Sequence, residues 1–141
     1  MLRRINAFFY DHFMDDALLH ARGMSPADPR RAFVDGYALR IPGIATLVPE
    51  ADSKAFGMVY ALTRAELTNL YAAQDHIAFR AVPVQARLVS GGSVPALCFS
   101  LPDPPDAEQF SHGYARRLAG VMIRLGLPTD GIRPHPQPQA A

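Results

Sequence analysis

The chain has 141 residues, 49% hydrophobic and 19% charged, a composition typical of one globular domain rather than of a disordered protein. Its net charge of +1 excludes the strongly basic surface that nucleic-acid-binding proteins and proteins of anionic membranes carry. No apolar run approaches the roughly 18 residues of a membrane span, and aspartates interrupt what would be the apolar core of a signal peptide, so we expect a soluble cytoplasmic protein.

The first elements are expected to be a strand, a short helix and a loop. Residues 5–10 are apolar and predict a strand that ends in a polar turn at Asp11 and His12. A helix of about two turns should begin at Asp15 or Asp16 and stop at Gly23, since acidic residues suit a helix start and glycine suits its end. Residues 25–31 contain two prolines and predict a loop.

Three strand-like runs follow. Residues 32–41 and 44–48 are separated by a Pro-Gly pair, and residues 49–54 are polar enough to predict a turn. Residues 55–62 alternate in character and predict another strand. Gly57 lies inside this strand and indicates close approach of a neighbouring backbone.

The clearest local signal is a T-x-x-E capping box from Thr63 to Glu66, which predicts a helix that ends near Gln74. A strand over residues 77–89 is expected next, at a sheet edge or with a bulge because it contains Pro83. A Gly-Gly pair then predicts a hairpin turn into a strand over residues 94–101.

Residues 107–125 carry apolar side chains at helical spacing and predict the longest helix. We expect residues 1–130 to form the domain and residues 131–141 to be a disordered, proline-rich tail. The order of elements predicts an α+β fold with a mixed, mostly antiparallel sheet of five to seven strands that curls into a partial barrel with flanking helices.

Two other candidate sites have simpler explanations. Cys98, the only cysteine, lies in an apolar run, so we expect a buried and unreactive thiol rather than a nucleophile. His12, Asp16 and His20 are spaced four residues apart, but three ligands on one helical stripe extend along the helix rather than around an ion. We therefore predict no metal site, and no cofactor.

Four stretches, in this order and spacing, resemble the gamma-glutamylcyclotransferase-like superfamily. They are FFYDHFM with the following LLHARG, IATLVPE with GMVYAL, TRAELTNLYAAQ, and GVMIRLGLP. Together they cover most of residues 5–130. The resemblance implies the superfamily's fold and a cavity between the loop Tyr10–Phe13 and the helix end at Gln74.

The resemblance also implies an activity. Active members cleave a γ-glutamyl amide by attack of the substrate's own α-amine on its γ-carbonyl, which releases 5-oxoproline and a free amine. One glutamate at the end of the second helix acts as general base and acid. A Y-G-S-N loop offers backbone N–H groups to an anionic part of the substrate.

The sequence departs from the superfamily at the catalytic helix. Gln74 stands at the position of the glutamate, and an amide side chain does not titrate near neutral pH. Tyr71 replaces an aspartate of the same motif. Asp75 is a possible substitute base, but one helical position turns a side chain by about 100°, so Asp75 reaches the site only where the helix has unwound.

The binding loop departs as well. Tyr10 is kept, whereas Asp11, His12 and Phe13 replace glycine, serine and asparagine. Asp11 places a carboxylate where the superfamily receives an anion. At an effective dielectric constant of about 20 and a separation of ~4 Å, the repulsion between two carboxylates is on the order of 4 kcal/mol. Alternatively, Asp11 and His12 merely cap the short helix that follows.

Three hypotheses remain. The chain retains the fold without the cyclotransferase reaction and binds a small molecule in the cavity, or serves as an interaction module. Alternatively, the chemistry has moved to Asp75 or to the Asp11–His12 pair. In the third, the chain is a related amide-bond enzyme with a different substrate.

Overall fold

The computed structural model describes residues 3–41, 46–72, 80–100 and 111–132. Five strands, three α-helices and one 3₁₀ turn make up the described part of the chain. In order they are β1 (Arg4–Phe9), η1 (His12–Met14), α1 (Asp16–Ala21), β2 (Ala27–Arg40), β3 (Thr46–Thr63), α2 (Arg64–Ala72), β4 (Arg80–Leu88), β5 (Ser93–Ser100) and α3 (His112–Arg124).

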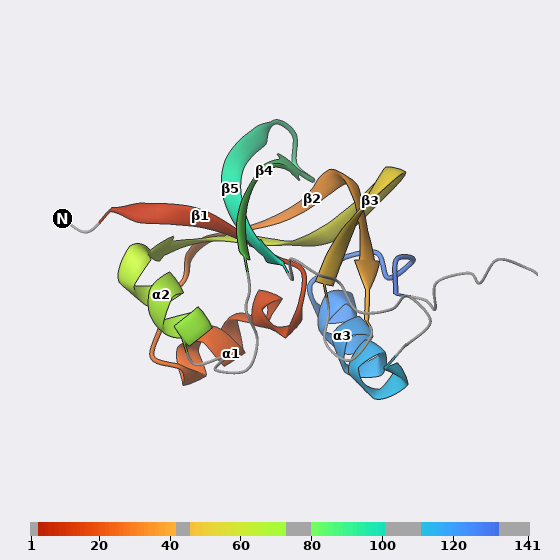
Figure 1. Cartoon of the computed structure of the whole chain (residues 1–141). Helices are drawn as coiled ribbons and strands as arrows, with labels where there is room; N and C mark the ends of the chain where they lie inside the picture. The colour runs from red at the N-terminus through yellow and green to blue at the C-terminus, as the bar shows by residue number, and fades with distance from the viewer. Residues whose placement is uncertain (1–2, 42–45, 73–79, 101–110, 133–141) are drawn as a thin grey trace, which may run out of the picture.

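The five strands close into a barrel in the order β1-β3-β2-β4-β5. Neighbouring strands are antiparallel except β1 and β5, which are parallel and pair Ala7 with Leu97 and Phe8 with Cys98. Figure 1 shows α1 and α2 together on one side below the barrel and α3 on the other side. The predicted α+β class and the mostly antiparallel, curled sheet are confirmed. None of the helices in the described residues is long and apolar enough to cross a membrane.

Two predicted connections are instead parts of strands. β2 begins at Ala27, within the expected loop, and a bulge at its start places Asp28 in the left-handed region with φ of 54°. β3 runs unbroken through the expected turn at residues 49–54. The register shift places residues 50–53 of β3 opposite the single residue Gly36 of β2, so a second bulge absorbs this polar segment without ending the strand.

The last helix starts later than its apolar spacing predicts. Ser111 has an extended backbone, and its side-chain oxygen accepts a hydrogen bond from the Tyr114 N–H at 3.4 Å. Serine is a favoured N-cap because its hydroxyl satisfies a backbone N–H that the first helical turn leaves without a partner. α3 therefore begins at His112, and the helix expected from about residue 107 to residue 125 does not run unbroken through Ser111. Residues 107–110 lie outside the described residues.

The core fills the barrel and extends under the helices. Phe8, Phe9, Leu62 and Leu118 are among its fully buried side chains. Gly57 of β3 lies against β1, and a Cβ atom at Gly57 would overlap the carbonyl oxygen of Phe9. The predicted close backbone approach is thus confirmed. It holds the end of β1 directly before Tyr10.

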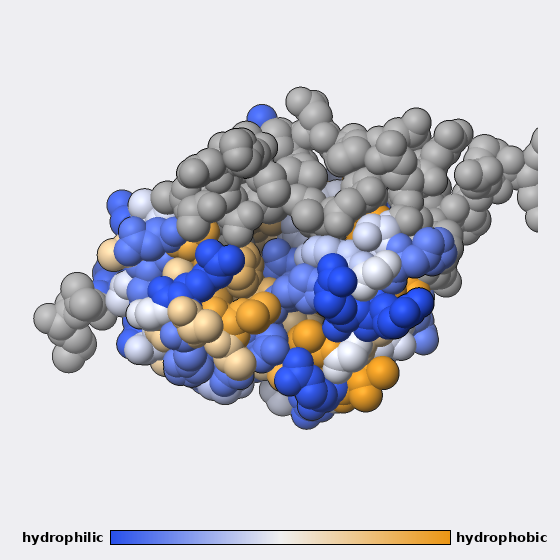
Figure 2. Space-filling view, turned by 90° about the horizontal axis from the view of Figure 1, so that it is seen from below, coloured by the Kyte–Doolittle hydropathy of each residue, from blue (hydrophilic) through white to orange (hydrophobic). Residues whose placement is uncertain are grey.

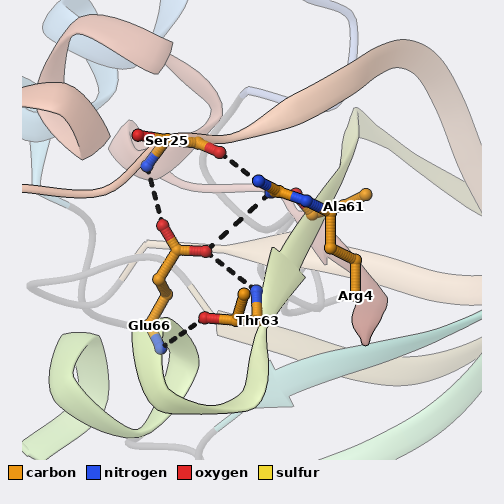
Figure 3. Close-up of polar contacts among 5 residues, drawn as sticks. All are labelled: Arg4, Ser25, Ala61, Thr63 and Glu66. Carbon is orange, nitrogen blue, oxygen red and sulfur yellow. Dashed lines mark hydrogen bonds and ion pairs between the residues drawn. The ribbon is translucent and has the colours of Figure 1, made fainter. Parts of the chain in front are cut away.

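The predicted capping box forms at the start of α2 and is part of a larger network (Figure 3). Thr63 N–H donates to Glu66 Oε1 at 2.8 Å, and Glu66 N–H donates to Thr63 Oγ1 at 3.1 Å. Glu66 Oε2 also accepts from the Ser25 N–H at 2.7 Å, and Arg4 Nη1 lies 3.9 Å from Glu66 Oε1. One carboxylate thereby connects α2 to β1 and to the segment after α1.

Candidate functional site

Tyr10 anchors the loop that follows β1. Its side chain is buried, and its hydroxyl donates a hydrogen bond to the Phe99 carbonyl oxygen on β5 at 2.7 Å. Burial, Asp11 and Cys98 raise the pKa of Tyr10 well above its usual value, while a hydrogen bond with buried Thr46 partly opposes them. The phenol therefore stays protonated and ties β1 to β5 at the barrel end.

Asp11 turns its carboxylate back onto its own loop. Its backbone is extended, and Oδ1 accepts a hydrogen bond from the Phe13 N–H at 3.1 Å as the N-cap of η1. Burial raises the pKa of Asp11 to about 6, although hydrogen bonds from the Phe13 N–H and from its own N–H oppose the change. A carboxyl group with a raised pKa thus accepts the backbone N–H groups of its own loop.

His12 packs between the loop and α3. Its ring centroid lies 4.2 Å from that of Tyr114, and its buried Nε2 atom has no hydrogen-bond partner among the described residues. Burial and, second, Arg117 lower the pKa of His12, while Asp15 raises it. The imidazole is therefore neutral at physiological pH, and an unpaired ring nitrogen faces a packed environment.

Phe13 contributes packing rather than polar chemistry. Its ring contacts Phe9 edge-on at 6.4 Å, and the Arg22 guanidinium lies 5.2 Å from its ring centroid. A half-buried aromatic residue covered by a cation stabilises the loop through apolar contact and cation–π attraction. Of the four predicted loop residues, Tyr10, Asp11 and His12 carry the polar groups.

The cap of α1 is Asp15, not the Asp11–His12 pair. Asp15 Oδ1 accepts a hydrogen bond from the Ala17 N–H at 3.1 Å, and Asp15 Oδ2 pairs with Arg124 at the end of α3 at 2.9 Å. Asp11 caps only the 3₁₀ turn before it. The two carboxylates therefore cap different elements: Asp11 caps η1, and Asp15 caps α1.

Three further polar residues interact with Tyr10 although they were not predicted as site residues. Thr46 is fully buried, Cys98 is buried on β5, and Tyr114 comes from α3. Burial and the Asp11 carboxylate raise the pKa of Cys98 to about 12, so its thiol is unreactive, as expected from its apolar surroundings. Only Thr46, in the IATLVPE stretch and at the start of β3, carried a sequence signal that could have found it.

The two predicted catalytic positions, Gln74 and Asp75, lie outside the described residues. Of the two segments expected to line the cavity, the structure therefore describes only the loop Tyr10–Phe13. Within the described ranges, no group of three or more His, Cys, Asp or Glu side chains could hold a metal ion.

Solved structures share this fold over almost the whole chain. A gamma-glutamyl cyclotransferase aligns with a TM-score of 0.75 and 15% identity over 98% of this chain and 92% of that chain. An uncharacterized human protein aligns with a TM-score of 0.75 and 17% identity, over 96% of this chain and 92% of that chain. A yeast gamma-glutamyl cyclotransferase specific to glutathione aligns with a TM-score of 0.66 and 10% identity, over 89% of this chain and 90% of that chain.

No protein-family model and no curated protein sequence matches the chain. The likeness to the solved structures is one of backbone arrangement, because few residues are shared. The chain thus has the gamma-glutamylcyclotransferase-like fold, as its sequence motifs predicted, and its own site residues must decide its chemistry.

Proposed function

We propose that this protein keeps the gamma-glutamylcyclotransferase-like fold, does not cleave γ-glutamyl amides in the usual way, and binds a small molecule at the barrel end. One observation carries the proposal: the Asp11 carboxylate accepts the Phe13 N–H at 3.1 Å. The backbone donors that the superfamily would offer to an anionic substrate are engaged by the protein's own carboxylate.

Charge strengthens this argument. With a pKa of about 6, Asp11 is mostly ionised at pH 7. A substrate carboxylate entering the loop would have to displace Asp11 and would still meet its negative charge, at a cost on the order of 4 kcal/mol. The amide of Gln74, at the family's glutamate position, supplies no proton transfer, which in enzymes is worth about 10²–10⁴-fold in rate.

A small-molecule ligand is favoured over a protein partner by the surface around the site. On the face that carries the helices, hydrophobic areas are separated by hydrophilic ones (Figure 2). Protein interfaces instead centre on a continuous apolar core.

A second candidate function rests on the unusual Asp11 carboxyl. A group with a pKa of about 6 exchanges its proton readily near neutral pH, and this property suits a general acid or base. In this alternative the chain is an amide-bond enzyme in which Asp11 carries the proton. Its substrate would present a neutral or cationic group to the loop.

Incubation of the purified protein with γ-glutamyl amino acids, followed by detection of 5-oxoproline, tests the main proposal. The same incubation with γ-glutamyl amides whose glutamyl α-carboxyl group is amidated, followed by detection of the released amine, tests the second candidate. The main proposal expects no turnover by the wild type. It further expects measurable turnover only after Gln74→Glu is combined with Asp11→Gly, since both obstacles are then removed.

Asp11→Asn and Asp35→Asn form a matched pair for this assay, because Asp35 is a surface carboxylate of β2 paired with Arg87. Wild-type turnover that Asp11→Asn abolishes and Asp35→Asn preserves would replace the main proposal with the second candidate. Wild-type turnover that neither substitution changes would exclude both.

A further inference from the structure

A separate cavity of about 470 Å³ opens beside the long β2–β3 pair, away from the loop Tyr10–Phe13. Its walls come from both strands, from α3 and from the segment that follows α3, which turns back beside β2 in Figure 1. The lining residues used below are Ala38, Arg40, Glu50, Asp52, Lys54, Phe56, Met122, Asp130 and Ile132. A volume of this size suits a small organic ligand.

One part of the lining is apolar. Ala38 and Met122 are buried, while Phe56 and Ile132 are half-buried and pack against the core. An apolar group placed here would remove both its own surface and that of the cavity from water. The cavity can therefore take the hydrocarbon body of a ligand.

The cations of the lining are engaged by the protein itself. Arg40 pairs with Glu50 at 2.9 Å and donates a second hydrogen bond to the Leu39 carbonyl oxygen at 3.1 Å. Lys54 Nζ lies 4.8 Å from the ring centroid of Phe33, a residue outside the lining. Glu50 therefore neutralises Arg40, whereas Lys54 keeps its charge and its ammonium group lies over Phe33.

The remaining carboxylates are not neutralised in this way. Asp52 and Asp130 are exposed on the lining, and their carboxylates make no hydrogen bond or ion pair with any other residue in the described ranges. Asp52 lies in the second bulge of β3, in the left-handed region with φ of 67°. With Arg40 and Glu50 paired, the cavity has two carboxylates against one lysine, so its field favours a cation.

We propose that this cavity binds a small amphipathic amine: a ligand with one ammonium group and a compact apolar body. The ammonium group interacts with Asp52 and Asp130, and the apolar body lies against Met122, Phe56 and Ile132. A carboxylate of the same shape meets uncompensated negative charge and is rejected. This site is independent of the function proposed for the loop Tyr10–Phe13.

The test is a titration of the full chain with phenethylamine, monitored by ¹H–¹⁵N NMR, with 3-phenylpropanoate and 2-phenylethanol as probes of the same shape. We expect saturable shifts at Ala38, Asp130 and Ile132 with the amine, weaker binding of the alcohol, and none with the carboxylate. Asp52→Asn and Asp130→Asn should each weaken amine binding about threefold to fivefold, as expected for exposed ion pairs.

Asp28→Asn is the matched control for Asp52→Asn. Both aspartates have a left-handed backbone, which asparagine tolerates, but Asp28 lies outside the lining. The control should bind phenethylamine as the wild type does. The proposal is overturned if the chemical shifts do not saturate with phenethylamine at about 10 mM, which corresponds to a binding free energy of roughly −2.7 kcal/mol. It is also overturned if the carboxylate binds as tightly as the amine, or if both cavity variants bind the amine as tightly as Asp28→Asn does.

Discussion

Replacing Asp11 by asparagine should stabilise the fold at neutral pH. Asparagine has nearly the same shape and can accept the Phe13 N–H through its side-chain oxygen, so the cap of η1 is retained. What disappears is a partly shielded carboxylate whose pKa is raised from 3.8 to about 6, chiefly by burial. The wild-type carboxylate is thus a cost to stability whenever it is ionised in the folded state.

The size of this cost follows from the change in pKa. A difference of about two pKa units corresponds to about 3 kcal/mol, which partial exposure of the residue reduces to about 2 kcal/mol. Between pH 4 and pH 6 the folded state binds a proton at Asp11 that the unfolded state has released, so this contribution to stability falls as pH rises. Asp11→Asn should equal the wild type near pH 4 and exceed it by about 2 kcal/mol at pH 7.

Urea denaturation followed by circular dichroism at pH 4, 5, 6 and 7 measures this difference. Asp35→Asn serves as the control, because it removes an exposed carboxylate paired with Arg87 and should change stability by less than about 1 kcal/mol. A difference between Asp11→Asn and the wild type that is constant over this range, or that has the opposite sign, would refute the argument from burial. The expected result would mean that the chain retains a destabilising carboxylate at its candidate site, a pattern typical of functional residues.

Three further substitutions test other parts of the structure by the same denaturation assay. Gly57→Ala should destabilise the fold by about 1–3 kcal/mol, because the added methyl group overlaps the Phe9 carbonyl oxygen. A variant as stable as the wild type would contradict the backbone contact. Glu66→Gln should cost about 1–2 kcal/mol at pH 7. Burial alone would raise the pKa of Glu66, but hydrogen bonds from Thr63 and Ser25 lower it. The greater stability of the wild type over Glu66→Gln should therefore be lost as pH falls below about 4.5. An equal loss in Glu66→Gln would disprove that role. His12→Phe should retain the ring contact with Tyr114 and remove the unpaired Nε2. Because burial and Arg117 lower the pKa of His12, the wild type should lose stability relative to the variant as pH falls below about 6.5; parallel curves would argue against a buried imidazole.

The chain's local features could be read directly from its residues. The Thr63–Glu66 capping box, the stop of α1 at Gly23 and the backbone approach at Gly57 all form as predicted. The glycine turn between β4 and β5 also forms, with Gly91 and Gly92 at positive φ. Each depends on a few neighbouring residues or on the absence of a side chain, so a short sequence window contains the relevant information.

The candidate loop shows where such windows fail. The sequence identified Tyr10 and Asp11 as loop residues and Gln74 as a departure, but it did not reveal that Asp11 binds its own loop's N–H group. Nor did apolar spacing locate the start of α3, because the capping hydrogen bond of Ser111 rather than the apolar pattern sets that boundary. At Asp11 one side-chain hydrogen bond decided between alternatives that the pattern left open, and at Ser111 another set a helix start that differs from the predicted one.

By itself, then, the sequence determined the fold class, the order of most elements and the superfamily whose backbone the chain shares. Tertiary structure alone decided the closure of the barrel through β1 and β5, the merging of two expected strands into β3, and the titration of Asp11 near neutral pH. These properties depend on groups distant in sequence, since Cys98 and Phe99 of β5 meet Tyr10 and Asp11 only after the barrel has closed. Burial, charge and hydrogen bonding at a site are properties of that three-dimensional neighbourhood, and no local pattern can specify them.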